Sequence, residues 1–387
     1  MAATRGPSDS VSERAPRRMR VLMVSKACVV GTYQSKLEAL AAFPGMELTV
    51  VVPPYWREPG RVLRYEPLHT RGYRTLILPQ HLNGRYHLHW YAGLTRVVER
   101  IQPDLVHIDE EPADVVAWQC QRAANLVGAR TLFFTWQNIL RRVPIPFRFF
   151  QQYVFDHASA AICGNQEAVR VVRAKGYRRI TAVIPQFGFD ERLFRPVTEP
   201  RVPGTRVRIG FAGRLVENKG ADLLIRAARH VPGDVEIVIA GSGPEEPKLR
   251  ALVDRLRLQS RVRFERNRPS ADMPAFLQSL DILAVPSLTR PNWKEQFGRV
   301  VAEAMGCAVP VVVSSCGELP NVVGDGGLVV QEGDVDALAG ALRRLIDDAA
   351  LRQELGSRGR QRLLRRFTQR AIAASTHGLY ARVLGHS

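Results

Sequence analysis

Two carboxylates, Glu295 and Glu303, stand eight residues apart around a predicted turn from loop to helix. A buried strand is predicted before them at 281–285, and a run of good helix formers follows Gly298. Free N–H groups at the start of such a helix can hold an anion such as a phosphate, and Glu303 can reach polar groups of the same ligand. Two ordinary surface glutamates are the alternative, but the glycine and the position after a strand favour a binding site.

A second group of charged residues follows the first predicted strand of the chain's second half. Gly213 allows a close approach of the backbone to a ligand, and Arg214 and Lys219 place two cations at the same strand end. This set suits a group of two phosphates, because charge-assisted hydrogen bonds to phosphate oxygens are strong. The alternative is a solvated turn with two ordinary charges.

A further glycine turn, around Gly243, resembles half of a dinucleotide fingerprint. The third glycine of that fingerprint is missing and Pro244 stands in the fourth position, which argues against a nicotinamide cofactor. The five cysteines are widely spread, and no pair has the spacing of metal ligands. We therefore expect buried, reduced thiols, no metal site and no cofactor.

The composition is typical of a soluble globular protein with a strongly basic charge. The chain has 387 residues, of which 45% are hydrophobic and 24% charged, and its net charge is +18. No apolar run reaches the roughly 18 residues that a membrane-spanning helix needs. The positive charge is consistent with phosphorylated substrates or an anionic membrane surface. Nucleic acid is a third partner class, but no helix-turn-helix, zinc finger or aromatic stacking signature supports it.

Short apolar strands alternate with helices along both halves, which predicts two doubly wound, Rossmann-like α/β domains. Ligands of such sheets bind outside the carboxyl ends of the strands, where the charged residues above lie. The predicted strands are 19–25, 48–52, 104–108, 131–134 and 160–163, then 207–211, 235–240, 262–264, 281–285 and 309–313. The predicted divisions are a disordered leader at 1–18, a first domain at 19–195, a linker at 196–206, a second domain at 207–367 and a C-terminal helix at 368–387.

Together, the motifs of the second half resemble the C-terminal half of retaining GT-B glycosyltransferases of family 4, the glycosyl transferases group 1. The resemblance covers roughly residues 206–347. It rests on the order and spacing of Gly213-Arg214-Leu215 with Lys219-Gly220, Gly241-Ser242-Gly243-Pro244, Pro286-Ser287, the Glu295 and Glu303 pair, residues 306–312 and Glu332-Gly333-Asp334. It implies two domains facing each other across a cleft, the first on the acceptor side and the second binding a nucleotide sugar.

The same resemblance implies the reaction. A sugar would move from a UDP- or GDP-sugar to a saccharide or lipid-linked acceptor, in cell-surface polysaccharide or glycolipid synthesis. Arg214 and Lys219 would neutralise the diphosphate, Glu295 would contact the transferred sugar and Glu303 the ribose. The other implied donor contacts are Phe297, Gly298, Arg299, Gly213 and Gly243.

The implied chemistry needs no metal. Charge grows on the nucleoside diphosphate as the glycosidic bond breaks, and a helix N-terminus with two fixed cations stabilises that charge. Retention without a well-placed nucleophile implies departure and attack on the same face of the sugar. The acceptor hydroxyl would then lose its proton to the departing phosphate.

The first domain departs from the family pattern after its third predicted strand. Many members place one histidine two residues beyond another; here His107 holds the earlier position and Asp109 the later one. A carboxylate can accept sugar hydroxyls or act as a base, so we expect Asp109 at the catalytic site, with Glu110 or Glu111 as second choice. Alternatively, this cluster caps the following helix.

Two more residues of the first domain are expected at the cleft. Asn138 follows the next predicted strand and would line the same cleft as Asp109. Gly31 matches the loop that in the family approaches the donor phosphates or the acceptor.

The segment at 141–150 mixes arginines with aromatic residues and suits an anionic membrane interface that presents a lipid-linked acceptor. The alternative is a helix with its apolar face in the core. The leader lacks the apolar centre of a secretory signal, so we expect a cytoplasmic protein, with peripheral contact at the inner membrane face left open. A nucleotide-sugar epimerase or hydrolase and a basic nucleic-acid-binding protein remain as other function classes.

Overall fold

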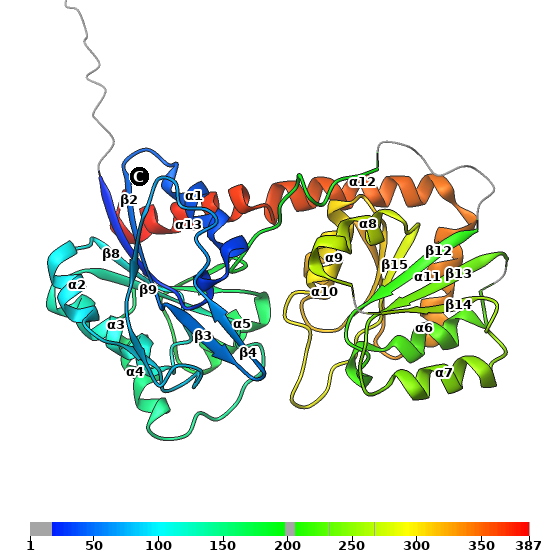
Figure 1. Ribbon diagram of the computed structural model, residues 1–387, viewed down its shortest axis with the longest axis horizontal. Helices are drawn as coiled ribbons and strands as arrows, with labels where there is room; N and C mark the ends of the chain where they lie inside the picture. Colours follow the sequence, from blue (N-terminus) through cyan, green and yellow to red (C-terminus); the bar gives the residue numbers. More distant parts are fainter. Residues whose placement is uncertain (1–17, 198–205, 232, 267, 387) are drawn as a thin grey trace, which may run out of the picture.

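The structure is a computed structural model that describes residues 18–197, 206–231, 233–266 and 268–386. It contains two α/β domains, each built on one parallel sheet with a hydrophobic core on either face (Figure 1). The predicted pair of doubly wound domains is confirmed. The predicted leader, except Arg18, and most of the predicted linker lie outside the described residues.

The first domain holds a seven-stranded sheet in the order β11-β10-β9-β8-β1-β2-β5, with all neighbours parallel. Its central strands are apolar because both faces are covered. The strands are β1 (Met19–Val24), β2 (Met46–Val52), β5 (Arg74–Ile77), β8 (Leu105–Ile108), β9 (Arg130–Thr135), β10 (Ala160–Cys163) and β11 (Ile180–Val183). The helices are α1 (Ser35–Ala41), α2 (Leu94–Ile101), α3 (Val115–Leu126), α4 (Phe147–His157) and α5 (Gln166–Ala174).

This domain also contains short elements outside its main sheet. Two antiparallel hairpins follow β2, formed by β3 (Tyr55–Glu58) with β4 (Arg61–Arg64) and by β6 (Gln80–His81) with β7 (Trp90–Tyr91). The 3₁₀ turns η1 (Ala27–Val29) and η2 (Gly31–Gln34) lead from β1 into α1.

The second domain holds a six-stranded parallel sheet in the order β14-β13-β12-β15-β16-β17. Its strands are β12 (Val207–Ala212), β13 (Val235–Ala240), β14 (Val262–Glu265), β15 (Ile282–Val285), β16 (Val311–Ser314) and β17 (Gly327–Val330). Its helices are α6 (Ala221–Ala228), α7 (Glu246–Arg255), α8 (Met273–Gln278), α9 (Arg299–Gly306), α10 (Leu319–Val323) and α11 (Val335–Asp347), with 3₁₀ turns η3 (Glu217–Lys219) and η4 (Ser270–Asp272).

The last two helices join the domains. α12 (Ala349–Arg366) packs on α9 in the second domain, and α13 (Gln369–Leu384) packs on α1 in the first. Figure 1 shows them as one long rod across both domains. The hydroxyl of Thr368, between them, caps α13 by accepting a hydrogen bond from the N–H of Ala371. The predicted C-terminal helix is therefore part of the first domain's core.

All ten predicted strands are present, within two residues at each end. Within the two parallel sheets, the prediction lacked β5, β11 and β17, and each of these lies at an edge of its sheet. Their residues are largely half-buried or exposed, so they lack the continuous apolar run that marks a central strand.

The expectation of buried, reduced thiols is confirmed, because all five cysteines are buried and unpaired. In the described part of the chain, no helix combines the length and the apolar character needed to cross a membrane.

Candidate active site

The loop between β15 and α9 carries the first glutamate of the predicted pair. Gly298 is the N-cap residue of α9 and has a φ of +77°. A Cβ at this position would lie 2.3 Å from the side chain of Leu319, so both the conformation and the space require glycine. The turn places the N-terminus of α9, with its unpaired N–H groups, at the carboxyl end of the sheet.

Glu295 forms an ion pair with Lys219, with 2.6 Å between Oε2 and Nζ. Lys219 ends η3, which follows β12, so the pair joins two strand-end loops. The carbonyl of Glu295 also accepts a hydrogen bond of 3.0 Å from the N–H of Glu318. Gly317 makes room for this contact, since a Cβ there would lie 2.2 Å from that carbonyl oxygen. The structure thus brings two predicted catalytic residues together.

Glu303, the second glutamate, lies one turn into α9 and is paired with Arg299. The distance from Arg299 Nε to Glu303 Oε1 is 2.9 Å. Burial raises the pKa of Glu303, and Arg299 opposes that shift. The guanidinium of Arg299 also lies 5.6 Å from the ring centroid of Phe189. A ligand hydroxyl would therefore compete with Arg299 for this carboxylate.

The side chain of Phe297 packs behind the start of α9. Its ring stacks on Phe189 at 5.8 Å and meets Phe367 edge-on at 5.4 Å between centroids. The ring therefore supports the loop that leads into α9.

Gly213 and Arg214 follow β12 as predicted, at the same sheet end as Lys219. Arg214 is exposed and forms no ion pair with any described residue. Gly243 serves packing, because a Cβ there would lie 2.3 Å from the carbonyl oxygen of Leu215. The glycine turn thus fixes the segment that carries Arg214.

Asp109 lies at the carboxyl end of β8, with its carboxylate fully buried. One oxygen, Oδ2, accepts hydrogen bonds from Ser25 Oγ at 2.6 Å and from Gln186 Nε2 at 3.1 Å. The other, Oδ1, is buried with no hydrogen-bond partner. Burial raises the pKa of Asp109. In this conformation the carboxylate has no accessible surface, so its predicted contact with the donor requires a rearrangement.

Glu110 binds Lys26 through both its carboxylate oxygens. Burial would raise the pKa of Glu110, but the charges and hydrogen bonds of Lys26 and His89 together outweigh burial and lower this pKa to about 2. Glu111 accepts hydrogen bonds from Thr135 Oγ1 at 2.6 Å and from the N–H of Trp136 at 2.8 Å. Burial raises the pKa of Glu111 to about 7 despite these two bonds.

The capping alternative for this cluster is wrong. α3 begins at Val115 and its N-cap residue is Asp114, so Glu110 and Glu111 lie before the helix start. Their carboxylates instead fix Lys26 and the segment after β9.

His107 has a structural role that the sequence did not indicate. Its Nδ1 lies 2.6 Å from the hydroxyl of Tyr380 on α13, and both residues are fully buried. Burial lowers the pKa of His107 well below its usual range, so the ring is neutral. The contact anchors the C-terminal helix to the first domain.

Gly31 has a packing role, and its expected approach to the donor phosphates or the acceptor stays a prediction. A Cβ at Gly31 would lie 2.7 Å from Leu68 Cβ, so this glycine makes room for the segment that carries Leu68. Asn138 does lie between the domains: its Nδ2 donates across the cleft to the carbonyl of Lys294 at 3.4 Å.

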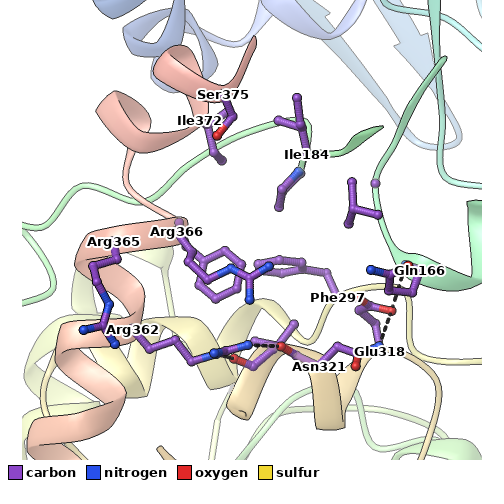
Figure 2. A pocket seen from close by; sticks show the side chains of 15 residues that line it. Gln166, Ile184, Phe297, Glu318, Asn321, Arg362, Arg365, Arg366, Ile372 and Ser375 are labelled. Carbon is purple, nitrogen blue, oxygen red and sulfur yellow. Dashed lines mark hydrogen bonds between the residues drawn. The ribbon is translucent and has the colours of Figure 1, made fainter. Parts of the chain in front are cut away.

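A cavity of about 210 Å³ lies between the domains and is lined by residues of both (Figure 2). It shares Phe297 with the predicted site but includes neither Lys219 nor Glu303. Its polar lining consists of Gln166, Glu318, Asn321, Arg362, Arg365, Arg366 and Ser375. We therefore separate this cavity from the donor site. Across the described ranges, no group of three or more histidine, cysteine, aspartate or glutamate side chains is arranged to hold a metal ion.

Sequence comparison finds similarity over most of the chain. Residues 198–362 match the family described as Glycosyl transferases group 1. The chain is 32% identical over 312 residues to a D-inositol 3-phosphate glycosyltransferase of Corynebacterium jeikeium, covering 73% of each protein. It is 30% identical over 303 residues to the lipopolysaccharide core biosynthesis glycosyltransferase LpsD of Rhizobium meliloti, covering 77% of this chain and 80% of that one.

Solved structures share the fold. A sucrose-phosphate synthase from Thermosynechococcus elongatus superposes with a TM-score of 0.67 at 22% identity, covering 96% of this chain and all of that one. Anabaena HepE, in complex with UDP and glucose, superposes with a TM-score of 0.64 at 20% identity, covering 94% of this chain and all of that one. The two domains and their cleft are thus those of the GT-B architecture.

Proposed function

The chain belongs to the glycosyl transferases group 1, and from that premise we propose that it is a retaining, metal-independent glycosyltransferase. It transfers a sugar from a UDP- or GDP-sugar to a saccharide or lipid-linked acceptor. The observation that carries this proposal is the ion pair of Lys219 and Glu295 beside the N-terminus of α9. A site for a diphosphate-linked sugar requires a cation and a helix N-terminus for the phosphates and a carboxylate for the sugar hydroxyls.

In this mechanism, Lys219, Arg214 and the first N–H groups of α9 bind the diphosphate. Negative charge grows on the leaving phosphate as its bond to the sugar breaks, and these fixed groups stabilise it without reorganising. They replace the divalent cation that other transferases use. Glu303 binds the ribose once a hydroxyl displaces Arg299 from its carboxylate.

Glu295 orients the transferred sugar by accepting hydrogen bonds from its hydroxyl groups, while the ion pair with Lys219 holds this carboxylate in place. The glycosidic bond to the phosphate breaks and the acceptor oxygen bonds to the anomeric carbon on the same face. The acceptor proton passes to the departing phosphate oxygen. No protein nucleophile takes part, and the configuration is retained.

The acceptor side includes a membrane-facing surface on the first domain. Ile145 and Phe149 are 85% and 60% exposed, and Leu140 is 63% exposed. Arg142 and Arg148 lie on the same segment and are exposed too. Apolar side chains among arginines suit an anionic lipid surface. α4 does bury Val154 and Phe155, so the helix serves the core with its C-terminal half. The enzyme then acts as a cytoplasmic protein that contacts the inner membrane face.

A donor screen with the full chain tests the function. We expect UDP or GDP sugars to raise the melting temperature, because a ligand of the folded state stabilises it. The positive donor is then incubated with inositol phosphate, phosphatidylinositol and lipopolysaccharide core acceptors, with and without excess chelator. Transfer in chelator, with the donor's anomeric configuration in the product by NMR, supports the proposal. Inversion of configuration or loss of activity in chelator contradicts it.

A further inference from the structure

The start of α5, in the first domain, docks on the loop that carries Glu295, in the second. Asn165 is the N-cap residue of α5 and is fully buried. Its Oδ1 accepts a hydrogen bond of 2.7 Å from the N–H of Ala168, and its Nδ2 donates to the carbonyl of Gln296 at 3.0 Å. One side chain thus caps its own helix and holds the neighbour of Glu295.

The next residue continues this contact. The N–H of Gln166 donates to Glu318 Oε2 at 3.1 Å, a bond that Figure 2 shows beside the interdomain cavity. The N–H of Glu318 in turn donates to the carbonyl of Glu295 at 3.0 Å. A single residue of the second domain therefore lies between the helix of the first domain and the main chain of Glu295.

Glu167, third in this run, forms an ion pair of 2.8 Å with Lys294. The side chain of Gln296 donates to the carbonyl of Trp136, in the first domain, at 3.0 Å. Both neighbours of Glu295 thus bind the first domain, while Glu295 itself binds Lys219 in the second. Successive residues of the loop therefore contact different domains.

From these contacts we infer that the N-terminus of α5, docked from the first domain on the loop of residues 294–296, positions Glu295 for the reaction. This inference rests on the proposed function. When the domains separate, the contacts of residues 294 and 296 with the first domain are lost, and Glu295 keeps only its anchors in the second. The sugar-contacting carboxylate is then correctly held only when the acceptor-side domain is docked. Lys294, Gln296 and Glu167 are positioning residues in this device.

The same geometry excludes another role for this helix start. The N–H of Gln166, at the first position of α5, is already paired with the carboxylate of Glu318. A donor phosphate would have to displace that carboxylate. The helix whose N-terminus is available to the diphosphate is α9, which follows the loop directly.

A charge exchange between Glu167 and Lys294 tests the device in the full chain. We expect Glu167→Lys to lower kcat roughly 10- to 100-fold, because a misplaced catalytic group costs that much, while the Kd for UDP or GDP stays unchanged. The double variant Glu167→Lys/Lys294→Glu restores both the ion pair and kcat. Gln296→Ala, an exposed side chain whose loss leaves the fold intact, lowers kcat in the same direction. The matched control is Lys248→Glu, which breaks an exposed ion pair with Glu245 on the second domain and leaves kcat unchanged.

Small-angle scattering provides a readout that does not depend on activity. Glu167→Lys raises the radius of gyration, because the domains part, and the double variant returns it to the wild-type value. If the double variant rescues neither kcat nor compactness, the inference is wrong. If Glu167→Lys weakens nucleotide binding as much as it lowers kcat, the pair belongs to donor binding and the inference also fails. If the wild-type chain transfers no sugar but the variants still change in compactness as expected, the proposed function is wrong, while the docking contact between the domains is supported.

Discussion

Lys219 and Glu295 lie 2.6 Å apart at the carboxyl end of the second sheet, although 76 residues separate them in the chain. They come together because β12 and β15, the strands before them, are neighbours in the sheet. Each charge compensates the other, so both side chains are held before any ligand binds. The pair prearranges a cation for the phosphate and a carboxylate for the sugar.

We predict that Lys219→Ala and Glu295→Ala each lower kcat by about 10²- to 10³-fold, the usual cost of one transition-state contact. Each variant removes a partner of the other residue, so the double variant should lose less than the product of the two single losses. Steady-state kinetics measures both effects. Lys248→Ala, on the exposed face of α7, is the control and should keep wild-type turnover. Full turnover in both single variants would show that the site is assigned wrongly.

Glu303 is predicted to recognise the ribose. Glu303→Ala should weaken donor binding by about 1.5–3 kcal/mol, the value of a hydrogen bond to a charged group. The wild type should lose a similar amount of binding free energy when the donor lacks the 2′- or 3′-hydroxyl. The variant should bind this deoxy donor only slightly more weakly than it binds the ordinary donor. Titration calorimetry with the four combinations measures the coupling. If the loss caused by the variant and the loss caused by the deoxy donor are additive, Glu303 does not bind the ribose.

Glu111 should make stability depend on pH. Burial raises its pKa from an ordinary 4.5 to about 7. Between these values the folded protein binds a proton that the unfolded chain has released, so the free energy of unfolding falls as pH rises. The loss amounts to about 3 kcal/mol by pH 7. Glu111→Gln removes this titration, so its stability relative to the wild type should rise by that amount from pH 4.5 to 7. Urea unfolding at several pH values measures the difference, and a flat difference would contradict the prediction.

Tyr380→Phe should loosen the C-terminal helix. The change leaves the buried Nδ1 of His107 without its partner, which costs about 1–3 kcal/mol. Thermal unfolding measures the loss, and hydrogen exchange should rise along α13. Tyr153→Phe is the control, because that hydroxyl bonds to Asn125 in an exposed contact. Equal melting temperatures for the two variants would contradict the anchoring role.

Binding to anionic membranes should depend on the exposed apolar side chains near the start of α4. Ile145→Asp and Phe149→Asp are expected to abolish flotation with vesicles that contain anionic lipid at low salt. Leu126→Asp is the control, since Leu126 is 69% exposed at the end of α3, outside this segment. Wild-type protein that fails to float would refute the membrane contact itself.

Much of the fold was predictable because central parallel strands are buried on both faces. β1, β8 and β15 are almost wholly apolar, so their positions could be predicted from the sequence. β5, β11 and β17 were missed because an edge strand is half-exposed and carries no such run. The burial of Asp109 in the first domain was not predicted either, because it depends on Ser25 and Gln186, which are distant from Asp109 in the chain.

The sequence by itself determined five of the six strands of the second domain's sheet, all but β17, and the candidate site residues at their ends. Gly298, Arg214 and the pair Glu295 and Glu303 follow from local rules, because a glycine turn, a strand end and a helix start each depend on neighbouring residues. Local rules also identified Lys219, but they did not pair it with Glu295.

Only the tertiary structure decided which distant groups meet. Glu318 reaches both Glu295 and Gln166, and Tyr380 reaches His107 from the far end of the chain. These contacts join different elements, and their partners are chosen by how sheets and helices pack rather than by spacing along the chain. The docking of α5 on the loop of Glu295 is such a contact, and it links the arrangement of the domains to the carboxylate that we place on the sugar.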